Sequence, residues 1–284
     1  MSELFYLMQW PLIASLILPW LLIYLGLHIV QRGVIFVDLA LAQTAAFGAA
    51  AAMLAGYDTH DWQNFVFSLG FTLAGAFVLT FTRTSRQQVP QEALIGIVYI
   101  VAAAAAILAL SRSTGGKEEL QRSLVGELLV VPPIEIWKTF VLYLLIGLTH
   151  LVFRKQFHRI SEDPRGAAAD GLHLRWWDFV FYMLFGLVVT AFVHIGGVLL
   201  TFSYLVIPAV CGIFLADGML RRFVVGWVVA TVGSVTSLGI TSQLDLPIGA
   251  AIVCVLGAFL MMTLIVCRFV PRWTSSASTS TIGQ

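Results

Sequence analysis

The sequence predicts an all-α membrane protein whose chain crosses the bilayer many times. Hydrophobic residues make up 59% of the 284 residues and charged residues only 11%, and the mean hydropathy is +0.92. A soluble domain needs far more polar surface than this composition supplies. Apolar runs of about 20 residues, long enough to span a bilayer, follow one another along nearly the whole chain.

Windows of about 19 residues place nine such runs. They leave no room for a separate soluble domain, so we expect one transmembrane domain over residues 1–273. The end of the chain, residues 274–284, is rich in serine and threonine and is expected to be a disordered tail. The nine predicted spans are residues 11–29, 33–55, 62–81, 92–110, 134–153, 176–194, 196–216, 223–241 and 247–267.

Positively charged residues are divided unequally between the two sets of connections. Alternate connections, beginning with the one at residue 32, hold 12 of the 16 lysine and arginine residues, and the opposite set holds the other four. Lysine and arginine near membrane spans stay on the cytoplasmic side. We therefore predict an N-terminus outside and a C-terminus in the cytoplasm.

The longest polar segment lies between the predicted fifth and sixth spans, at residues 154–175. It carries five lysine and arginine residues, which places it in the cytoplasm. The polar run from Ser161 to Asp163 ahead of Pro164 is typical of a helix start, and Gly171 is typical of a helix end. A short surface helix between two spans either docks onto a partner or is simply a solvated helical loop.

Asp38 is an ionisable residue well inside a predicted span. Burying a charge there costs about 2.5–3.5 kcal/mol on insertion scales, so such a residue is a functional candidate. At a rise of about 1.5 Å per residue, Asp38 lies roughly 8 Å beyond Gly33, and Gln43 lies roughly 8 Å further in. Asp38 either lines a substrate pathway or bonds a neighbouring helix. Gln43 and Thr44 are further pathway candidates, although a structural role is favoured because they are cheaper to bury.

The sixth and seventh spans add weaker candidates. His194 ends the sixth span near the outer surface, where it is either an interfacial histidine or a metal ligand at a pore mouth. Ser203 and Tyr204 precede Pro208, which lacks a backbone donor and is expected to bend the helix at mid-membrane depth. Bent helices build ion sites in transporters, so Ser203 and Tyr204 are candidates for the substrate pathway.

Two connections on the predicted outer side are polar. Asp58, His60 and Asp61 are residues of the types that bind metals. An acidic mouth would also raise the local concentration of cations. The alternative for each of them is an ordinary polar loop residue. Residues 111–127 form a longer connection that contains a pair of glycines.

Missing motifs exclude several function classes. The glycine pair before Lys117 lacks the upstream glycine and the following Ser/Thr of a P-loop, so the chain does not bind ATP in that way. The motifs of zinc proteases and serine hydrolases are also absent, and we expect no catalytic residue and no enzyme. The cations form no stripe, which argues against nucleic acid. The three cysteines lie apart in apolar runs, as core residues do.

Three stretches together resemble the membrane subunit of the ABC-type importers for zinc, manganese and iron. Residues 162–172 resemble the family's Asp-Pro-x-x-Ala-x-x-x-Gly-Leu segment, residues 197–209 its Gly-Val-Leu-Leu to Pro-Ala helix, and residues 244–253 its Asp-Leu-Pro-x-Gly-Ala-x-Ile-Val signature. The resemblance covers roughly residues 10–270. It implies that the segment 154–175 is the coupling helix that docks on a separate ATPase subunit. The residues that it assigns to this contact are Asp163, Pro164, Arg165, Asp170 and Gly171.

The second span departs from the pattern of these importers. The family usually has an aspartate and a histidine four residues apart, on one helical face. Aligned on Gly48, Gln43 takes the place of the histidine and Leu39 that of the aspartate, while Asp38 stands one residue early. Five residues turn a helix by about 140°, so Asp38 and Gln43 point in different directions. An amide oxygen is also a poorer zinc ligand than imidazole, so the choice of metal stays open.

The resemblance predicts a permease subunit that moves divalent zinc, manganese or iron ions into the cytoplasm. It implies a multi-pass protein of the bacterial cytoplasmic (inner) membrane, with a separate ABC ATPase, a periplasmic or lipoprotein metal-binding protein and a second permease copy as partners. No cofactor is expected on this chain, and the divalent metal is the substrate. Asp38, His60 and His194 are the candidate metal contacts. Asp245, ahead of Pro247, either receives the cation at the outer end or caps a helix.

Three alternatives stay open. The chain could be an ABC permease for a metal chelate or another small solute. It could also be an ion-coupled secondary transporter that uses Asp38 as its titrating carboxylate. A structural membrane scaffold is the third alternative.

Overall fold

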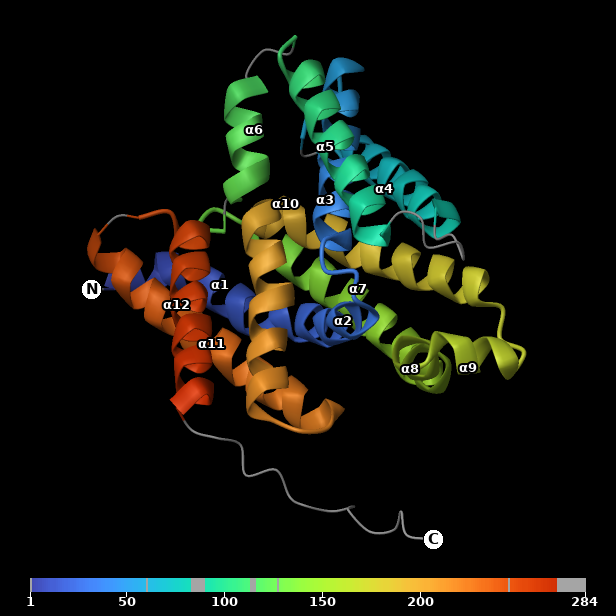
Figure 1. Cartoon of the computed structure of the whole chain (residues 1–284). Helices are drawn as coiled ribbons and strands as arrows, with labels where there is room; N and C mark the ends of the chain where they lie inside the picture. Colours follow the sequence, from blue (N-terminus) through green and yellow to red (C-terminus); the bar gives the residue numbers. More distant parts are fainter. Residues whose placement is uncertain are drawn as a thin grey trace, which may run out of the picture.

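The computed structural model describes residues 2–59, 61–82, 90–112, 116–126, 128–244 and 246–269. These residues form helices and no strand, which confirms the predicted all-α class. The predicted tail lies outside the described residues. The helices are α1 (Ser2–Ile17), α2 (Pro19–Arg32), α3 (Val37–Leu54), α4 (Trp62–Thr82), α5 (Gln91–Leu110), α6 (Gly116–Val125), α7 (Pro133–Val152), α8 (Arg154–Glu162), α9 (Pro164–Ala169), α10 (Leu174–Leu215), α11 (Met219–Leu244) and α12 (Ile248–Phe269) (Figure 1).

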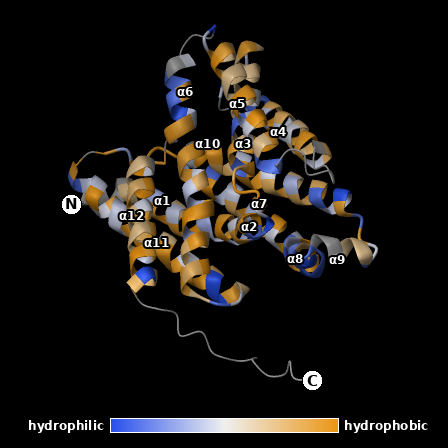
Figure 2. Cartoon of the chain, in the orientation of Figure 1, coloured by the Kyte–Doolittle hydropathy of each residue, from blue (hydrophilic) through white to orange (hydrophobic). Residues whose placement is uncertain are grey.

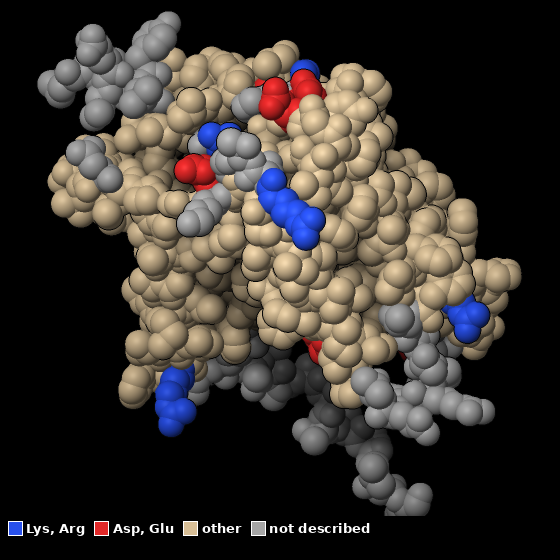
Figure 3. Space-filling view, turned by 90° about the horizontal axis from the view of Figure 1, so that it is seen from above, with Lys and Arg blue, Asp and Glu red and all other residues tan. Residues whose placement is uncertain are grey.

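Most of these helices are long and apolar. Eight stretches of the described residues are long and apolar enough to cross a membrane, with α1 and α2 together supplying one of them, Met8–Arg32. Figure 2 shows hydrophobic colouring along the long helices and hydrophilic residues concentrated in short elements such as α8. On the face seen in Figure 3, lysine, arginine, aspartate and glutamate occur only in small scattered groups. The multi-pass membrane protein expected from the sequence is confirmed.

The eight stretches correspond to the nine predicted spans, because α10 holds two of these spans on either side of a kink. This helix of 42 residues contains both predicted spans 176–194 and 196–216. Its backbone leaves helical geometry at Gly197, with φ 73° and ψ 171°, a conformation that glycine adopts without the steric cost of a Cβ. Figure 1 shows that the two halves of α10 run in different directions. The break at Gly197 lies beside the predicted boundary between these two spans, and Pro208 lies inside the second half of α10, where the predicted bend stays a prediction.

α10 is the central element of the bundle. It packs against α2, α3, α4, α11 and α12, and its buried face supplies large aromatic residues such as Phe181 and Phe192 to the core. Small residues let neighbouring helices approach closely, as is usual in membrane bundles. A Cβ added at Gly26 on α2 would collide with the carbonyl group of Leu205 on α10.

Connections that the sequence places on one side of the membrane gather at the same end of the bundle. At one end, the backbone N–H of Ile35, between α2 and α3, donates a hydrogen bond of 2.6 Å to Glu92 at the start of α5. At the other end, the residue after α6, Gly126, packs against Gly196 near the break in α10. This grouping agrees with the predicted alternation of the connections. Which end faces the cytoplasm stays a prediction.

Two of the observed helices lie in segments that were expected to be loops or a single short helix. α6 lies in the predicted outer connection 111–127. α8 precedes the short helix predicted in the polar segment, and it buries Phe157 and Ile160 while its charged residues stay exposed. Apolar residues three apart in a charged stretch mark one face of an amphipathic helix, so the sequence did carry the signal for α8.

Candidate functional site

Asp38 lies in the first turn of α3 and is 1% exposed. In the part of the chain that the structure describes, its Oδ1 has no hydrogen-bond partner. Glu92 on α5 is close enough for the charges of the two carboxyl groups to act on each other, and its own Oε2 is buried without a partner among the described residues. A buried carboxyl oxygen without a partner is costly, and a bound cation would offset that cost.

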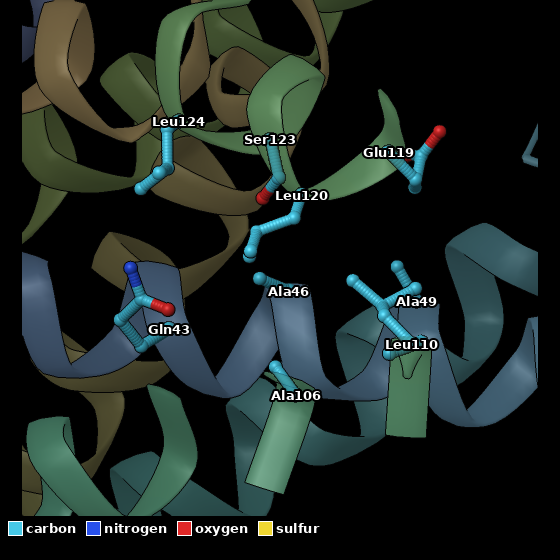
Figure 4. Close-up of a pocket in the computed structure, with 10 residues that line it drawn as sticks. Gln43, Ala46, Ala49, Ala106, Leu110, Glu119, Leu120, Ser123 and Leu124 are labelled. Atoms are coloured by element: carbon cyan, nitrogen blue, oxygen red, sulfur yellow. The ribbon is translucent and has the colours of Figure 1, made fainter. Parts of the chain in front are cut away.

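Gln43 faces a small enclosed pocket between α3, α5 and α6. Its side chain is buried, with the residue only 7% exposed. Figure 4 shows its amide pointing toward α6, while Ser123 points from α6 toward α3 and the carboxylate of Glu119 points away. The cavity volume is about 30 Å³, which is room for one or two water molecules or a single ion. The lining residues are Gln43, Ala46, Ala49, Ala50, Ala106, Leu110, Glu119, Leu120, Ser123 and Leu124.

The three candidates of the second span are not brought together. Gln43 lines the pocket, whereas Asp38 does not. Thr44 turns toward α4, where its side chain would touch a Cβ added at Gly75, and its hydroxyl donates to the carbonyl of Leu41 at 2.8 Å. Asp38 and Gln43 therefore lie in different surroundings along α3.

The candidates of α10 have partners within the bundle. The Ser203 hydroxyl donates to the carbonyl of Leu199 at 2.8 Å. The Tyr204 hydroxyl lies 2.6 Å from that of Ser234 on α11, and both residues are fully buried. His194 is exposed, and its Nδ1 lies 2.8 Å from the carbonyl oxygen of Thr190 one turn earlier. Ser203 and Tyr204 thus serve helix packing in this conformation, and their place in a pathway stays a prediction.

The proposed metal contacts do not form a site within one chain. No three histidine, cysteine, aspartate or glutamate side chains of the described residues gather so that they could hold a metal ion. His60 and Asp245 lie outside the described residues. Asp38 and Gln43 are the predicted pathway residues of α3 whose buried side chains carry oxygen atoms that suit a metal ion.

The segment formed by α8, α9 and the residue that follows them, residues 154–170, carries the predicted short surface helix, and we call it the docking segment. Asp163 is the N-cap of α9, and its carboxylate accepts a hydrogen bond from the backbone N–H of Gly166 at 3.0 Å. Arg159 on α8 donates to Asp170 at 2.9 Å and lies 3.5 Å from Asp163. After α9, Gly171 has φ 83°. The predicted helix start and stop are confirmed.

Of the residues that the resemblance assigns to ATPase contact, Asp163 and Asp170 are exposed at the surface. Pro164 and Arg165 begin α9, but their side chains lie outside the described part. The exposed carboxylates are fixed by Arg159 rather than free to rotate. The docking segment therefore presents a braced polar surface.

A buried ion pair beneath the docking segment was missed from the sequence. Nη1 of Arg32 lies 3.0 Å from Oδ1 of Asp178, and both side chains are buried. Arg32 was counted as a loop cation. Asp178 lies inside a predicted span, so the cost of an intramembrane charge was a signal that could have found it.

The geometry is that of a helical membrane bundle with a braced polar segment at one end and a buried carboxyl group in the spanning part. The model of the ABC 3 transport family matches residues 4–267. The chain belongs to this family. As an ABC 3 protein it is a membrane transport subunit and not an enzyme, and it crosses the membrane several times.

Named relatives of this ABC 3 chain are transport proteins. The manganese transport system membrane protein MntC of Listeria innocua is 24% identical over 231 residues, which are 81% of this chain and 80% of that protein. The chelated iron transport system membrane protein YfeD of Yersinia pestis is 24% identical over 216 residues, or 75% of this chain and 72% of that protein. The solved structure of PsaBC from Streptococcus pneumoniae has a TM-score of 0.78 at 21% identity and covers 93% of this chain and 95% of that chain, which shows the shared fold.

Proposed function

We propose that the chain is the permease subunit of an importer that moves divalent metal ions, manganese first among them, into the cytoplasm. The single observation that carries this proposal is the buried carboxyl group of Asp38, one oxygen of which has no partner among the described residues. Its charge and that of Glu92 act on each other. The chain also belongs to a family of transport subunits. The names of the relatives point to manganese and iron.

The donor atoms favour manganese over zinc. The pocket at Gln43 offers the amide oxygen of Gln43 and the hydroxyl of Ser123, and its lining contains neither imidazole nor thiolate. Oxygen ligands suit Mn²⁺, whereas zinc sites in proteins are usually built with histidine and cysteine. Gln43 and Asp38, at different heights of α3, would then be successive oxygen contacts of one ion.

The energy would come from a separate ABC ATPase that binds the docking segment. The chain has no P-loop, and the polar surface at Asp163 and Asp170 is exposed and braced. A periplasmic or lipoprotein metal-binding protein would deliver the ion, and a second permease copy would complete the pathway, in the bacterial cytoplasmic membrane. Thr44, Ser203, Tyr204, His194, His60 and Asp245 remain pathway candidates.

A metal chelate is the second candidate cargo. It is favoured by the absence of a grouped metal site among the described residues and by the relative named for chelated iron transport. The cavity of about 30 Å³ argues for the bare ion in this conformation, because it has room for a single ion but not for a chelate.

Reconstitution tests the function. The chain and the ATPase that co-purifies with it are placed in liposomes with ATP, and uptake of radioactive Mn²⁺ is measured against competing Fe²⁺, Zn²⁺ and a ferric chelate. We expect ATP-dependent Mn²⁺ uptake that excess Zn²⁺ inhibits weakly. Uptake driven by a proton gradient without ATP would favour the secondary transporter, and uptake of the chelate alone would favour the second candidate.

A further inference from the structure

A buried ion pair joins α2 to α10 at the end of the bundle where the docking segment lies. The side chains of Arg32 and Asp178 are only 5% and 2% exposed, with Nη1 and Oδ1 3.0 Å apart. The guanidinium group also lies 3.9 Å from the centroid of the Phe181 ring. Both charges are removed from solvent, and such a pair is costly to break because the remaining charge stays buried.

Ser161 connects this ion pair to the docking segment. It lies on the buried face of α8, two residues before Asp163. Nε of Arg32 donates a hydrogen bond of 2.9 Å to the Ser161 hydroxyl, and Nδ1 of His28 lies 3.1 Å from the same oxygen. The hydroxyl itself donates to the carbonyl of Phe157 within α8. The docking segment is therefore tied to α2 by a charge-assisted hydrogen bond, one of the stronger kinds.

The same arginine is close in sequence to Asp38, the buried carboxyl group of the spanning part. Arg32 is the last residue of α2, and Gly33 turns the chain with φ 66°. The turn is held on its far side, where Ile35 donates to Glu92. Asp38 follows only six positions after Arg32. One short turn therefore joins Arg32 to the start of α3.

We propose that Arg32, Asp178 and Ser161 are the linkage through which movement of the docking segment reaches Asp38. The inference rests on the proposed function. The three are positioning residues, since their described contacts are with one another and with the helices that they join. A movement of α8 would shift Arg32 and α10 together, and the α2–α3 turn would follow.

The chemistry of the linkage fits this role better than a purely structural one. Well-packed apolar side chains of similar volume often stabilise a core as much as a buried ion pair does. An apolar contact slides, whereas the planar guanidinium holds a carboxylate and a hydroxyl in fixed directions. The ion pair therefore resists both pulling and pushing between α8, α2 and α10.

The test uses two variants that leave the exposed docking surface intact. Ser161→Ala removes the hydroxyl, and Arg32→Lys keeps a positive charge beside Asp178 but loses the Nε donor. Each is reconstituted with the co-purifying ATPase, and Mn²⁺ uptake and ATP hydrolysis are measured in the same liposomes. We expect hydrolysis to persist in both variants while the ions moved per ATP fall by about tenfold, the size of a typical coupling between sites.

Hydrogen exchange gives a second measurement that does not depend on transport. In both variants, we expect the amides of residues 33–38 to exchange about tenfold faster than in wild type. The lost hydrogen bond between Arg32 and Ser161 no longer opposes local opening of the α2–α3 turn. The matched control is Thr72→Val, which removes a buried hydroxyl contact of 3.0 Å between α4 and α10, away from the docking segment. Thr72→Val should leave both the number of ions moved per ATP and the exchange rates of residues 33–38 at wild-type values.

The outcomes separate the linkage from the proposed function. If wild type hydrolyses ATP but moves no metal, the proposed function is overturned, and the exchange of residues 33–38 alone decides the linkage. If wild type transports Mn²⁺ and both variants keep its ratio of ions to ATP, the linkage is overturned. Unchanged exchange at residues 33–38 in both variants overturns it as well. Loss of coupling and faster exchange in the Thr72→Val control would show general loosening and would also overturn it.

Discussion

Arg159 on α8 donates a hydrogen bond of 2.9 Å to Asp170, the residue that directly follows α9. This contact closes the docking segment on itself and fixes the exposed carboxylates. Exposed ion pairs of this kind contribute only about 0–1 kcal/mol to stability. The contact therefore shapes a binding surface rather than holding the bundle together.

Replacing this arginine should weaken ATPase binding without unfolding the protein. For Arg159→Ala we expect about a tenfold loss of co-purifying ATPase, which corresponds to about 1.4 kcal/mol of binding free energy. The melting temperature should stay close to that of wild type. The control is Arg122→Ala, which removes a partly exposed ion pair with Glu119 on α6, 3.8 Å long. Equal ATPase binding in wild type and Arg159→Ala would contradict this account of the docking segment.

The break in α10 should not tolerate a side chain. A Cβ at Gly197 would collide with the backbone of Gly126, and the positive φ adds strain of about 1–3 kcal/mol. We expect Gly197→Ala to lower the melting temperature in detergent. In Gly257→Ala, the matched control on α12, the added methyl group meets no atom within 4 Å. Since alanine favours a helix, the control should be as stable as wild type or more so.

The fold was predictable because each span carries its own signal in its hydrophobicity. The sequence analysis separated the spans 176–194 and 196–216 at residue 195, two positions before the break at Gly197, and predicted a further bend at Pro208. What decides the break is the packing of Gly197 on Gly126, which are 71 positions apart in the chain. A contact between residues so distant in sequence leaves no local pattern.

The site was predictable only in part, for the same reason. Asp38 was found because a charge in a span is conspicuous, and the docking segment was found from its local capping residues. Ser161 was taken as part of a helix start, but it lies in α8 and is buried by Arg32, 129 positions earlier. The pocket at Gln43 depends on α6, which the sequence analysis treated as a loop.

The Tyr204 contact distinguishes packing from transport. Tyr204→Phe removes a buried hydrogen bond of 2.6 Å to Ser234, which should cost about 0.5–1.5 kcal/mol of stability. If the hydroxyl serves only the packing of α10 on α11, Mn²⁺ uptake by the folded variant should match wild type. Loss of uptake with an unchanged melting temperature would instead place Tyr204 in the pathway.

The identity of residue 43 should set the choice of metal. Gln43→His puts an imidazole nitrogen at the pocket between α3, α5 and α6, and imidazole is a better zinc ligand than an amide. We expect Zn²⁺ to inhibit Mn²⁺ uptake at about tenfold lower concentration in this variant, a change of about 1.4 kcal/mol. Ser123→Ala, on the opposite wall of the pocket, adds no nitrogen and should not increase zinc inhibition. An unchanged inhibition curve for Gln43→His would show that the pocket does not contact the ion.

The central claim is that the buried carboxyl group of Asp38 attracts the transported cation. Its most direct test is Mn²⁺ uptake in ATP-driven liposomes by Asp38→Asn, compared with Asp217→Asn, which makes the same change at an exposed aspartate between α10 and α11. We expect Asp38→Asn to keep its bound ATPase and lose uptake by about a hundredfold, equivalent to about 2.7 kcal/mol, while Asp217→Asn transports normally. Wild-type uptake by Asp38→Asn would contradict the account.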